Sequence, residues 1–457
     1  MKITVCIRQG QDGSISPFDA CAYEAALRID GAEITLLSMG PAAAQDLLLK
    51  LTRLGAKKAI LLCDNAFAGA DTLATARTLA LAVKKLEPDL VLCGRQTLIG
   101  DTGQTPIMLS ELLGYGIINN VMSIDRVTES NIFCTTRDEG EQVQGFPALI
   151  TVERINTLRF PRISSKCGEL LVWNAADIGA DSSLCGLAGS PTRVLKIFEN
   201  TSGKRKCKFI GRGELEGIIA QSINKNREQL TPDTTSQQKL NCVLTVGKGC
   251  EPYAASVCDN ITVLGDATAD EICKKIEDLH PNAVLFACDT RSARTAAQVA
   301  ARLGLGLCAD CTRLECEQDR LIMYRPALSG SVIAKIKSLT SPALATVRTQ
   351  SARQSDVIIA AGYGVKDRLD DIRALCRSVG ADFGASRKLV DNGYARYDEQ
   401  IGLTGKTVSP SVYVAVGISG AVHHIVGMDR SATVIAVNPD PDAPIFEYAD
   451  YGIIDEF

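Results

Sequence analysis

The stretch SVYVAVGISGAVHH, from Ser411 to His424, decides the fold of the region around it. Its apolar run, Val412 to Val416, has the length and the β-branched composition of a buried strand. The Gly-Ile-Ser-Gly segment that follows indicates a tight turn into a helix, the basic unit of an open α/β sheet. The chain has three histidines in all, and two of them follow this turn. From spacing alone, His424 fits a satisfied core histidine as well as a ligand-binding one.

Similar apolar runs recur along the chain and alternate with helical patterns. They include MKITVCI, EITLLSM, KAILLCD and DLVLCG near the start, and NAVLFAC and DVIIAAG later. Continuous apolar strands of this kind are typical of parallel sheets that are covered on both faces. The sequence therefore predicts an α/β fold with several open sheets.

The composition narrows the class of protein. With 457 residues, 46% hydrophobic and 22% charged, the chain is globular and long enough for two to four domains. A net charge of −4 argues against a nucleic-acid scaffold. No apolar run reaches the length of a membrane span, so we expect a protein that is not membrane-embedded. Seventeen irregularly spaced cysteines predict buried thiols in a reducing cytoplasm.

The chain divides into two related halves and a third part. A polar segment, 224–239, contains Pro232 and has no apolar periodicity, which is typical of a linker. On either side of it PDLVLCG resembles PNAVLFA, and FPALITV resembles SPALATV, which indicates an internal duplication of one α/β domain. We expect a nucleotide-binding domain over 1–190, a connecting arm and linker over 191–239, a related domain over 240–350, and a third domain over 351–457.

Glycines and small polar residues follow strand ends in two of these parts. In the first half, GRQTLIGDTGQ offers a candidate phosphate-binding turn, although a purely structural turn fits equally well. Its candidate residues are Gly94, Gln96, Gly100, Asp101, Thr102 and Gln104. The matching turn of the second half carries Arg291 and Arg294 and no glycine, so we expect no nucleotide there. CADC, at 308–311, lacks a second pair or a nearby histidine, and we expect buried thiols rather than a metal site.

The third part is richest in candidate ligands. DVIIAAGYGV places Gly362 and Gly364 after a strand, GADFGASRKLV places Ser386 and Arg387 in a loop, and Asn438 follows a third strand. Carboxyl ends of parallel strands meet at one edge of a sheet, where open sheets bind dinucleotides.

These residues resemble a known family. GASR, QIGLTGKTVSPSVYVAVGISGAVHHIVGM and VNPDPDAPIFEYADYG closely resemble the FAD domain of the electron transfer flavoprotein α subunit. AARLGLGLCADCT and YRPALSGSVIAKI look like the N-terminal domain of that subunit. ISPFDACAYEAALRI, GRQTLIGDTGQ and GLAGSPTRV look like the β subunit. The resemblance implies a single-chain fusion, β before α: two related open-sheet α/β domains plus a C-terminal FAD-binding, doubly wound parallel-sheet domain.

The resemblance also implies roles for individual residues. Arg387 would lie beside the isoalloxazine ring, Thr404 near flavin N5, and His424 would donate on the O2 side. Other residues would line the ring and the pyrophosphate path: Ser386, Gln400, Gly402, Gly405, Ser419, Gly420, Ala421, Gly362 and Gly364. Asn438 and Asp450 would hold the adenosine portion. A cation and a hydrogen-bond donor at N1–O2 stabilise the reduced flavin.

The sequence departs from the family pattern at several positions. Tyr363 stands where the family usually has arginine, Leu403 where it has glutamine, and Ile99 where aspartate is common. By resemblance the first-half site takes AMP or a second FAD, and we expect AMP or no ligand more than a flavin.

Three functions therefore stay open at this stage. The first is a one-FAD electron carrier rather than a stand-alone enzyme. Its donor would be a flavin-dependent dehydrogenase of acyl-CoA dehydrogenase type or similar, and its acceptor a quinone oxidoreductase or another redox protein. The second is an electron-bifurcating protein whose second FAD oxidises NADH. The third is a nucleotide-binding protein that has lost its redox function.

Overall fold

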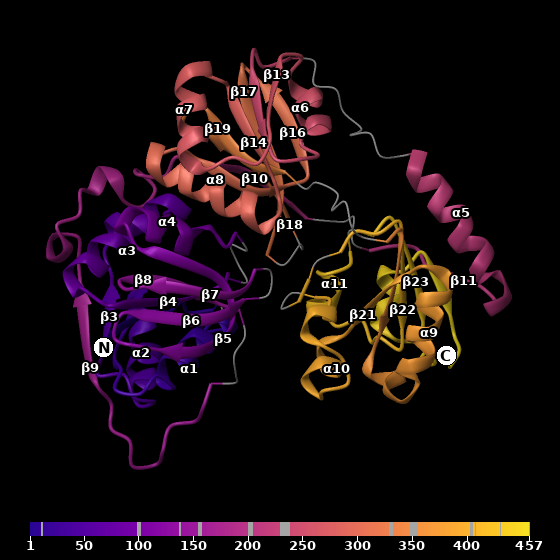
Figure 1. Cartoon of the computed structure of the whole chain (residues 1–457), viewed down its shortest axis with the longest axis horizontal. Helices are drawn as coiled ribbons and strands as arrows, with labels where there is room; N and C mark the ends of the chain where they lie inside the picture. Colours follow the sequence, from indigo (N-terminus) through magenta and orange to yellow (C-terminus); the bar gives the residue numbers. More distant parts are fainter. Residues whose placement is uncertain are drawn as a thin grey trace. The chain divides into compact units, whose positions relative to one another are not determined.

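The computed structural model describes all of the chain except residues 11, 98–101, 137–138, 154–157, 200–203, 229–237, 329–331, 348–354, 403–404, 407, 430 and 457, and gives only the backbone of 224–228. The chain forms two compact units (Figure 1). The first contains 1–197, 234–328 and 334–349, and the second contains 198–233, 329–333 and 350–457. Each unit is considered by itself below. The predicted α/β class with several parallel-dominated sheets is confirmed, whereas the finer division into four segments stays a prediction.

The first unit contains the sheet formed by the N-terminal part of the chain. Its strands are parallel except at β5–β6 and β6–β7. In spatial order they are β7 (Gly140–Gly145), β6 (Asn131–Thr136), β5 (Gly116–Val127), β8 (Ala148–Val152), β4 (Leu90–Gly94), β1 (Lys2–Cys6), β2 (Glu33–Met39), β3 (Lys58–Leu62) and β9 (Glu169–Trp173). Its helices are α1 (Pro17–Leu27), α2 (Gln45–Thr52), α3 (Thr72–Leu86) and α4 (Gln104–Leu113).

Two further sheets complete this unit. The parallel one has the order β13 (Ile261–Leu264), β12 (Val243–Val246), β14 (Ala283–Ala287), β19 (Ala343–Val347) and β15 (Leu307–Cys311). The other has the order β10 (Thr192–Glu199), β18 (Val332–Ser338), β17 (Arg320–Ala327) and β16 (Arg313–Glu317). The helices are α6 (Glu251–Val257), α7 (Ala269–Leu279) and α8 (Thr290–Leu303).

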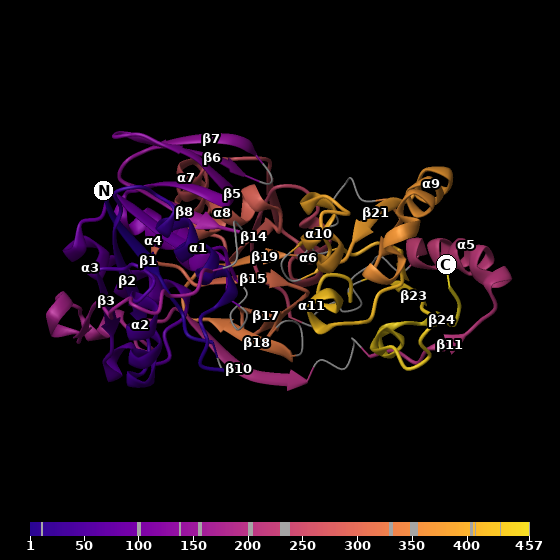
Figure 2. The same cartoon turned by 90° about the horizontal axis from the view of Figure 1, so that it is seen from below.

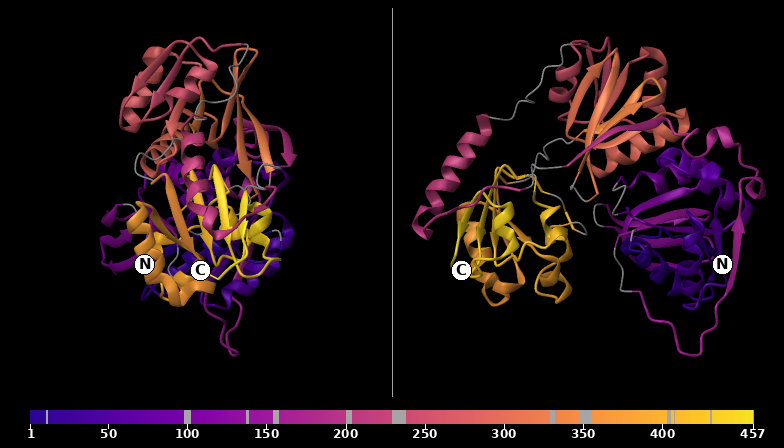
Figure 3. Two further views of the ribbon diagram at one scale, coloured as in Figure 1. Left: turned by 90° about the vertical axis from the view of Figure 1, so that its right-hand side faces the viewer. Right: turned by 180° about the vertical axis from the view of Figure 1, so that it is seen from behind.

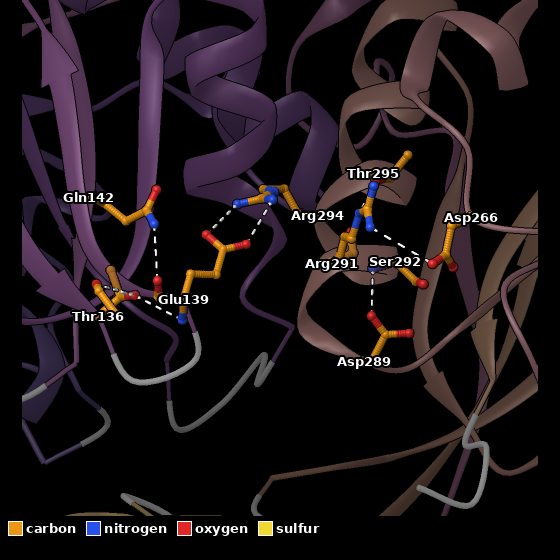
Figure 4. A network of polar contacts seen from close by, with 10 residues as sticks. Thr136, Glu139, Gln142, Asp266, Asp289, Arg291, Ser292, Arg294 and Thr295 are labelled. Carbon is orange, nitrogen blue, oxygen red and sulfur yellow. Dashed lines mark hydrogen bonds and ion pairs between the residues drawn. The ribbon is translucent and has the colours of Figure 1, made fainter. Parts of the chain in front are cut away.

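The pairing in the two parallel regions agrees with the expected duplication. β4 leads into α4 and pairs in parallel with β8, and β14 leads into α8 and pairs in parallel with β19. Helices α4 and α8 pack against each other, and one apolar core includes residues of both. Arg294 of α8 donates to both carboxylate oxygens of Glu139, at 3.2 and 3.0 Å (Figure 4). Arg291 lies 3.8 Å from Asp266. Both arginines therefore make ion pairs within the protein.

The second unit is built on one parallel sheet. Its order is β11 (Lys208–Phe209), β24 (Tyr451–Ile453), β23 (Thr433–Val437), β22 (Val412–Val416), β20 (Val357–Ala361) and β21 (Asp382–Ala385). The helices are α5 (Leu215–Glu228), α9 (Leu369–Val379), α10 (Arg387–Asp391) and α11 (Val422–Ile425). In Figure 2, α5 and α9 lie beside each other next to this sheet, and Figure 3 shows the same unit from two sides, with α5 in magenta and the part after residue 350 in orange and yellow.

Both faces of this sheet are buried. Val357, Ile359 and Ala361 of β20 lie in one core with residues of α9, while Ile358 and Ala360 lie in the core on the opposite face. This alternation explains why the strand is apolar throughout rather than at every second position. Within the described residues, no helix has the length and apolarity needed to cross a membrane.

Candidate functional site

A cavity of about 980 Å³ opens at the carboxyl ends of the strands of the second unit. This volume lies at the upper end of the range usual for ligand pockets. The lining residues follow β20, β21, β22, β23 and β24, as the strand-end rule predicts. The predicted site residues that line it are Gly362, Gly364, Ser386, Arg387, Gln400, Gly402, Ser419, Ala421, His424 and Asn438. Their contact with a ligand stays a prediction.

Two glycine turns form the floor of the cavity. Gly417 follows β22 with a φ of +62°, a left-handed conformation that favours glycine. The turn after β20 packs directly on it, because a Cβ at Gly362 would overlap the Gly417 carbonyl group. Gly362 N–H donates to the Val416 carbonyl at 2.7 Å and so fixes this approach. Both glycines therefore serve backbone-to-backbone packing as well as access to the cavity.

Residues 418–421 are held by the neighbouring strand end. The Asn438 side-chain amide donates to the Ile418 carbonyl at 2.9 Å, and Ile445 N–H donates to the Ser419 carbonyl at 3.2 Å. Gly420 has a φ of +91°, and a Cβ there would overlap the Ile445 backbone. Gly420 does not line the cavity, and its role here is to let this turn pack. Asn438 is placed at the cavity, but its amide hydrogen bond is made within the protein.

Ser386 and Arg387 begin the short helix α10. Ser386 N–H donates to the Ala361 carbonyl at 2.9 Å, which ties this loop to the end of β20. The buried Ser386 Oγ has no hydrogen-bond partner among the described residues. Arg387 Nε donates to Asp391 at 3.2 Å, and its half-exposed guanidinium stays at the cavity rim. The start of α10 therefore places one hydroxyl without a described hydrogen-bond partner and one cation at the cavity.

Lys388 and Tyr363 also lie at the cavity and were not predicted as site residues. Lys388 Nζ lies 4.3 Å from the centre of the Tyr363 ring, and both residues line the cavity. Tyr363 holds the position where the resemblance suggested an arginine. The nearby Lys388 brings a positive charge to the same side of the cavity. Sequence patterns do not reveal this compensation, because the two residues are far apart in the chain.

Gln400, Ile401 and Gly402 line the next side of the cavity. Gln400 is fully buried, and its carbonyl accepts a hydrogen bond from Lys406 N–H at 2.8 Å. Gly402 has a φ of +136°, and a Cβ there would lie 2.6 Å from the His423 carbonyl oxygen. Gly405 does not line the cavity, and a Cβ there would overlap the Gln400 backbone. Thr404 lies outside the described residues, so its predicted place near flavin N5 stays untested.

His424 lies on α11 with only 7% of its surface exposed. Its Nε2 is 2.9 Å from the hydroxyl oxygen of Tyr413, which is fully buried in β22. Its Nδ1 makes no hydrogen bond of normal geometry with the described residues. Burial lowers the pKa of His424 to about 4, although the Ile401 backbone acts in the opposite direction. The ring is therefore neutral near pH 7. His423 lines the cavity as well but is exposed.

Two acidic residues that follow the last strand line the cavity, whereas the predicted residue Asp450 does not. Asp455 and Glu456 follow β24 and line the cavity, and Asp455 lies 3.6 Å from Arg212. Asp450 precedes β24, at the opposite edge of the sheet, where it accepts from Val434 N–H at 2.8 Å and pairs with Arg205. The prediction that Asp450 holds adenosine therefore finds no support in its position. Applying the strand-end rule to β24 would have selected Asp455.

The described candidate site residues of the first half lie between the carboxyl end of β4 and the start of α4. Gly94 N–H donates at 3.2 Å to Asp19, a buried carboxyl whose pKa burial raises to about 7. Gln104 is buried and accepts from the Thr72 hydroxyl at 3.3 Å, while its Nε2 has no partner among the described residues. Thr102 Oγ1 accepts from Gln104 N–H at 3.4 Å. Gln96 lies in the same turn, and Gly100 and Asp101 lie outside the described residues.

Comparison with known proteins decides the family. The model of the electron transfer flavoprotein domain matches residues 3–177 and 253–364. The model of the electron transfer flavoprotein FAD-binding domain matches 351–429, which contains most of the residues around the cavity. The chain belongs to the electron transfer flavoprotein family.

Curated relatives agree with a chain that joins both kinds of subunit. The electron transfer flavoprotein subunit alpha of Thermoanaerobacterium thermosaccharolyticum is 33% identical over 248 residues, 43% of this chain and 75% of the relative. The subunit beta of Clostridium acetobutylicum is 37% identical over 200 residues, 42% of this chain and 77% of the relative. Protein FixA of Azorhizobium caulinodans is 37% identical over 249 residues, 50% of this chain and 88% of the relative. The resemblance to a β–α fusion is confirmed.

The cavity fits the FAD group that this family's C-terminal domain binds. Its volume of about 980 Å³ is sufficient for a dinucleotide-sized ligand, and two buried polar atoms, Ser386 Oγ and His424 Nδ1, lack partners among the residues that the structure describes. A ligand with several acceptors and a hydroxyl-rich chain supplies the missing partners.

The Gly420 conformation gives a stability prediction. We expect Gly420→Ala to destabilise the second unit by about 3 kcal/mol, because positive φ and overlap with Ile445 act together. Gly380 is the matched control: it has a φ of +66° but open space around it, so Gly380→Ala is expected to cost about 1 kcal/mol. Urea denaturation followed by circular dichroism measures both. Equal costs for the two variants would contradict the packing role.

The buried neutral His424 gives a pH prediction. Its folded pKa of about 4 lies below the usual 6.5, so between these values the unfolded chain binds more protons than the folded one. The free energy of unfolding should therefore fall as pH drops from 6.5 towards 4, by up to about 3 kcal/mol from this residue. Denaturation midpoints of wild type and His424→Gln across this range measure it. Parallel pH profiles for the two proteins would refute the assignment.

Proposed function

We propose that this protein is an electron carrier that holds one FAD in the cavity of its second unit and moves electrons between two redox partners. The observation that carries the proposal is the cavity itself. It joins glycine turns, an unsatisfied buried hydroxyl, a neutral histidine and a rim cation within a domain that matches the FAD-binding model. The donor is a flavin-dependent dehydrogenase of acyl-CoA dehydrogenase type or similar. The acceptor is a quinone oxidoreductase or another redox protein, and the site of action is the cytoplasm.

The order of the strands orients the cofactor. Cationic residues lie on the β20–β21 side of the edge, namely Arg368, Arg387 and Lys388, with Asp391 among them. Acidic residues lie on the β23–β24 side, namely Asp440, Asp455 and Glu456. Carboxylates accept hydrogen bonds from ribose hydroxyls, and cations stabilise a reduced, anionic ring. Residues on the β21 side would therefore hold the flavin ring, residues on the β24 side the adenosine, and the turn after β22 the pyrophosphate.

Each residue then has a defined task. Bound FAD supplies the capacity to accept and release electrons. Arg387 provides the positive charge that favours the reduced ring, while the Ser419–Ala421 backbone and Ser386 Oγ bind polar atoms of the cofactor. His424 donates from inside the cavity without adding charge. Gln400 and Gly402 form the wall that excludes water from the ring.

A second function has one observation in its favour. Among the described residues, the buried Gln104 amide nitrogen has no partner at the sheet edge of the first unit, where a second ligand such as AMP or FAD would supply one. A second FAD at this position that oxidises NADH would make the protein electron-bifurcating. AMP there leaves it a one-flavin carrier.

Counting the cofactors separates these functions. We expect acid denaturation of the purified protein to release about one FAD per chain, together with AMP or no other nucleotide. Two FAD per chain and bleaching by NADH would support bifurcation instead. A colourless protein that binds AMP or ADP tightly, and takes up no FAD on reconstitution, would refute the carrier function.

The role of Arg387 is tested by the flavin potential. We expect Arg387→Ala to lower the midpoint potential by on the order of tens of millivolts, since a cation near the ring favours the reduced anion. Arg377→Ala is the matched control, because Arg377 lies in the last turn of α9 and is not among the cavity residues. Spectroelectrochemical titration of the three proteins measures the shift. An unchanged potential in Arg387→Ala would remove Arg387 from the flavin site.

A further inference from the structure

The pair Tyr413–His424 joins a hydroxyl of the core to a histidine that lines the cavity. Tyr413 is fully buried in β22, and its side chain packs in the apolar core on the α11 side of the sheet. Its hydroxyl lies 2.9 Å from His424 Nε2, and this is the only hydrogen bond of that hydroxyl among the described residues. The same imidazole lines the cavity and has an Nδ1 without a regular partner.

The number of donors and acceptors on the two side chains decides which of them donates in the Tyr413–His424 hydrogen bond. A neutral imidazole has one donor and one acceptor nitrogen, whereas a tyrosine hydroxyl can do both. If Nε2 donated, the buried Tyr413 O–H would have no acceptor in the described surroundings, which is costly. If Tyr413 donates, Nε2 is the acceptor and the hydrogen lies on Nδ1. The ring nitrogen that remains unsatisfied is then an N–H group.

We propose that Tyr413 is a positioning residue that holds His424 in the Nδ1–H tautomer and so makes it a neutral donor into the cavity. Ligands that present a carbonyl oxygen there are selected over ligands that present a donor. Where the proposed function holds, on which this part rests, the acceptor is a carbonyl oxygen of the flavin ring. The site then recognises the ring without a buried positive charge.

The tautomer can be measured without any flavin. Histidine labelled with ¹⁵N gives separate signals for protonated and unprotonated ring nitrogens, and the chain contributes only three histidines. The His424 signals are assigned by their loss in His424→Gln. We expect the cofactor-free wild type at pH 7 to carry its hydrogen on Nδ1, and Tyr413→Phe to lose this preference. A wild-type ring protonated on Nε2 would overturn the proposal, whether or not FAD binds.

The effect on the ligand is a separate measurement. We expect Tyr413→Phe to weaken FAD binding about tenfold, as the loss of one hydrogen-bond preference implies. Tyr448→Phe is the matched control, since Tyr448 packs against the same core but is not a cavity residue, and the FAD affinity of this variant should be unchanged.

The outcomes separate the two proposals. If wild type binds no FAD while the His424 hydrogen lies on Nδ1, the carrier function fails and the tautomer assignment stands. If Tyr413→Phe does not fold, the wild-type spectrum alone still decides the assignment. Equal FAD affinity in wild type and a folded Tyr413→Phe overturns the selective role.

Discussion

The site depends on one backbone contact, the packing of the turn after β20 on the turn after β22. A side chain at Gly362 would overlap the Gly417 carbonyl, so the two turns meet only because both residues lack a Cβ. Their strands, β20 and β22, pair in one sheet whose two faces are buried. The pairing brings the two strands to an end at the same edge of the sheet, so the two turns begin side by side. Loops from β21, β23 and β24 then surround this pair and leave a cavity above it. The ligand site is thus a consequence of how closely two chain segments approach.

Charge in this cavity is distributed by the order of the strands. Because β22 lies between β20 and β23, residues that follow β20 and β21 are separated from those that follow β23 and β24. The first group carries Arg368, Arg387 and Lys388 with one carboxylate, Asp391, and the second carries Asp440, Asp455 and Glu456. An electrically asymmetric ligand therefore has a single favourable orientation. Sequence order alone does not show this, since β24 is last in the chain yet lies beside β23.

The sequence was sufficient to predict strands β20, β22 and β23 of the second unit and the glycine turns after β20 and β22, and ten of the predicted ligand residues lie at the cavity. Its success rests on local signals: apolar runs bounded by glycines, and the rule that ligands bind at carboxyl strand ends. It failed where contacts are not local. Lys388 reaches Tyr363 from a different loop, and Tyr413 meets His424 through the core. Asp450 was selected by resemblance, although it precedes β24, whereas the cavity residue Asp455 follows it.

In the proposed FAD site, a buried neutral histidine and a half-exposed arginine would divide two tasks that one residue cannot perform well. A buried imidazolium would have to be desolvated, and burial already holds the pKa of His424 near 4. The positive charge is instead on Arg387, where half-exposure and Asp391 reduce the cost of carrying it. The buried position then needs only a donor of fixed direction, and a hydroxyl in the core is enough to fix it. The buried donor can therefore recognise the ligand from inside the cavity. The cation at the rim can stabilise a negative charge that develops on the ligand.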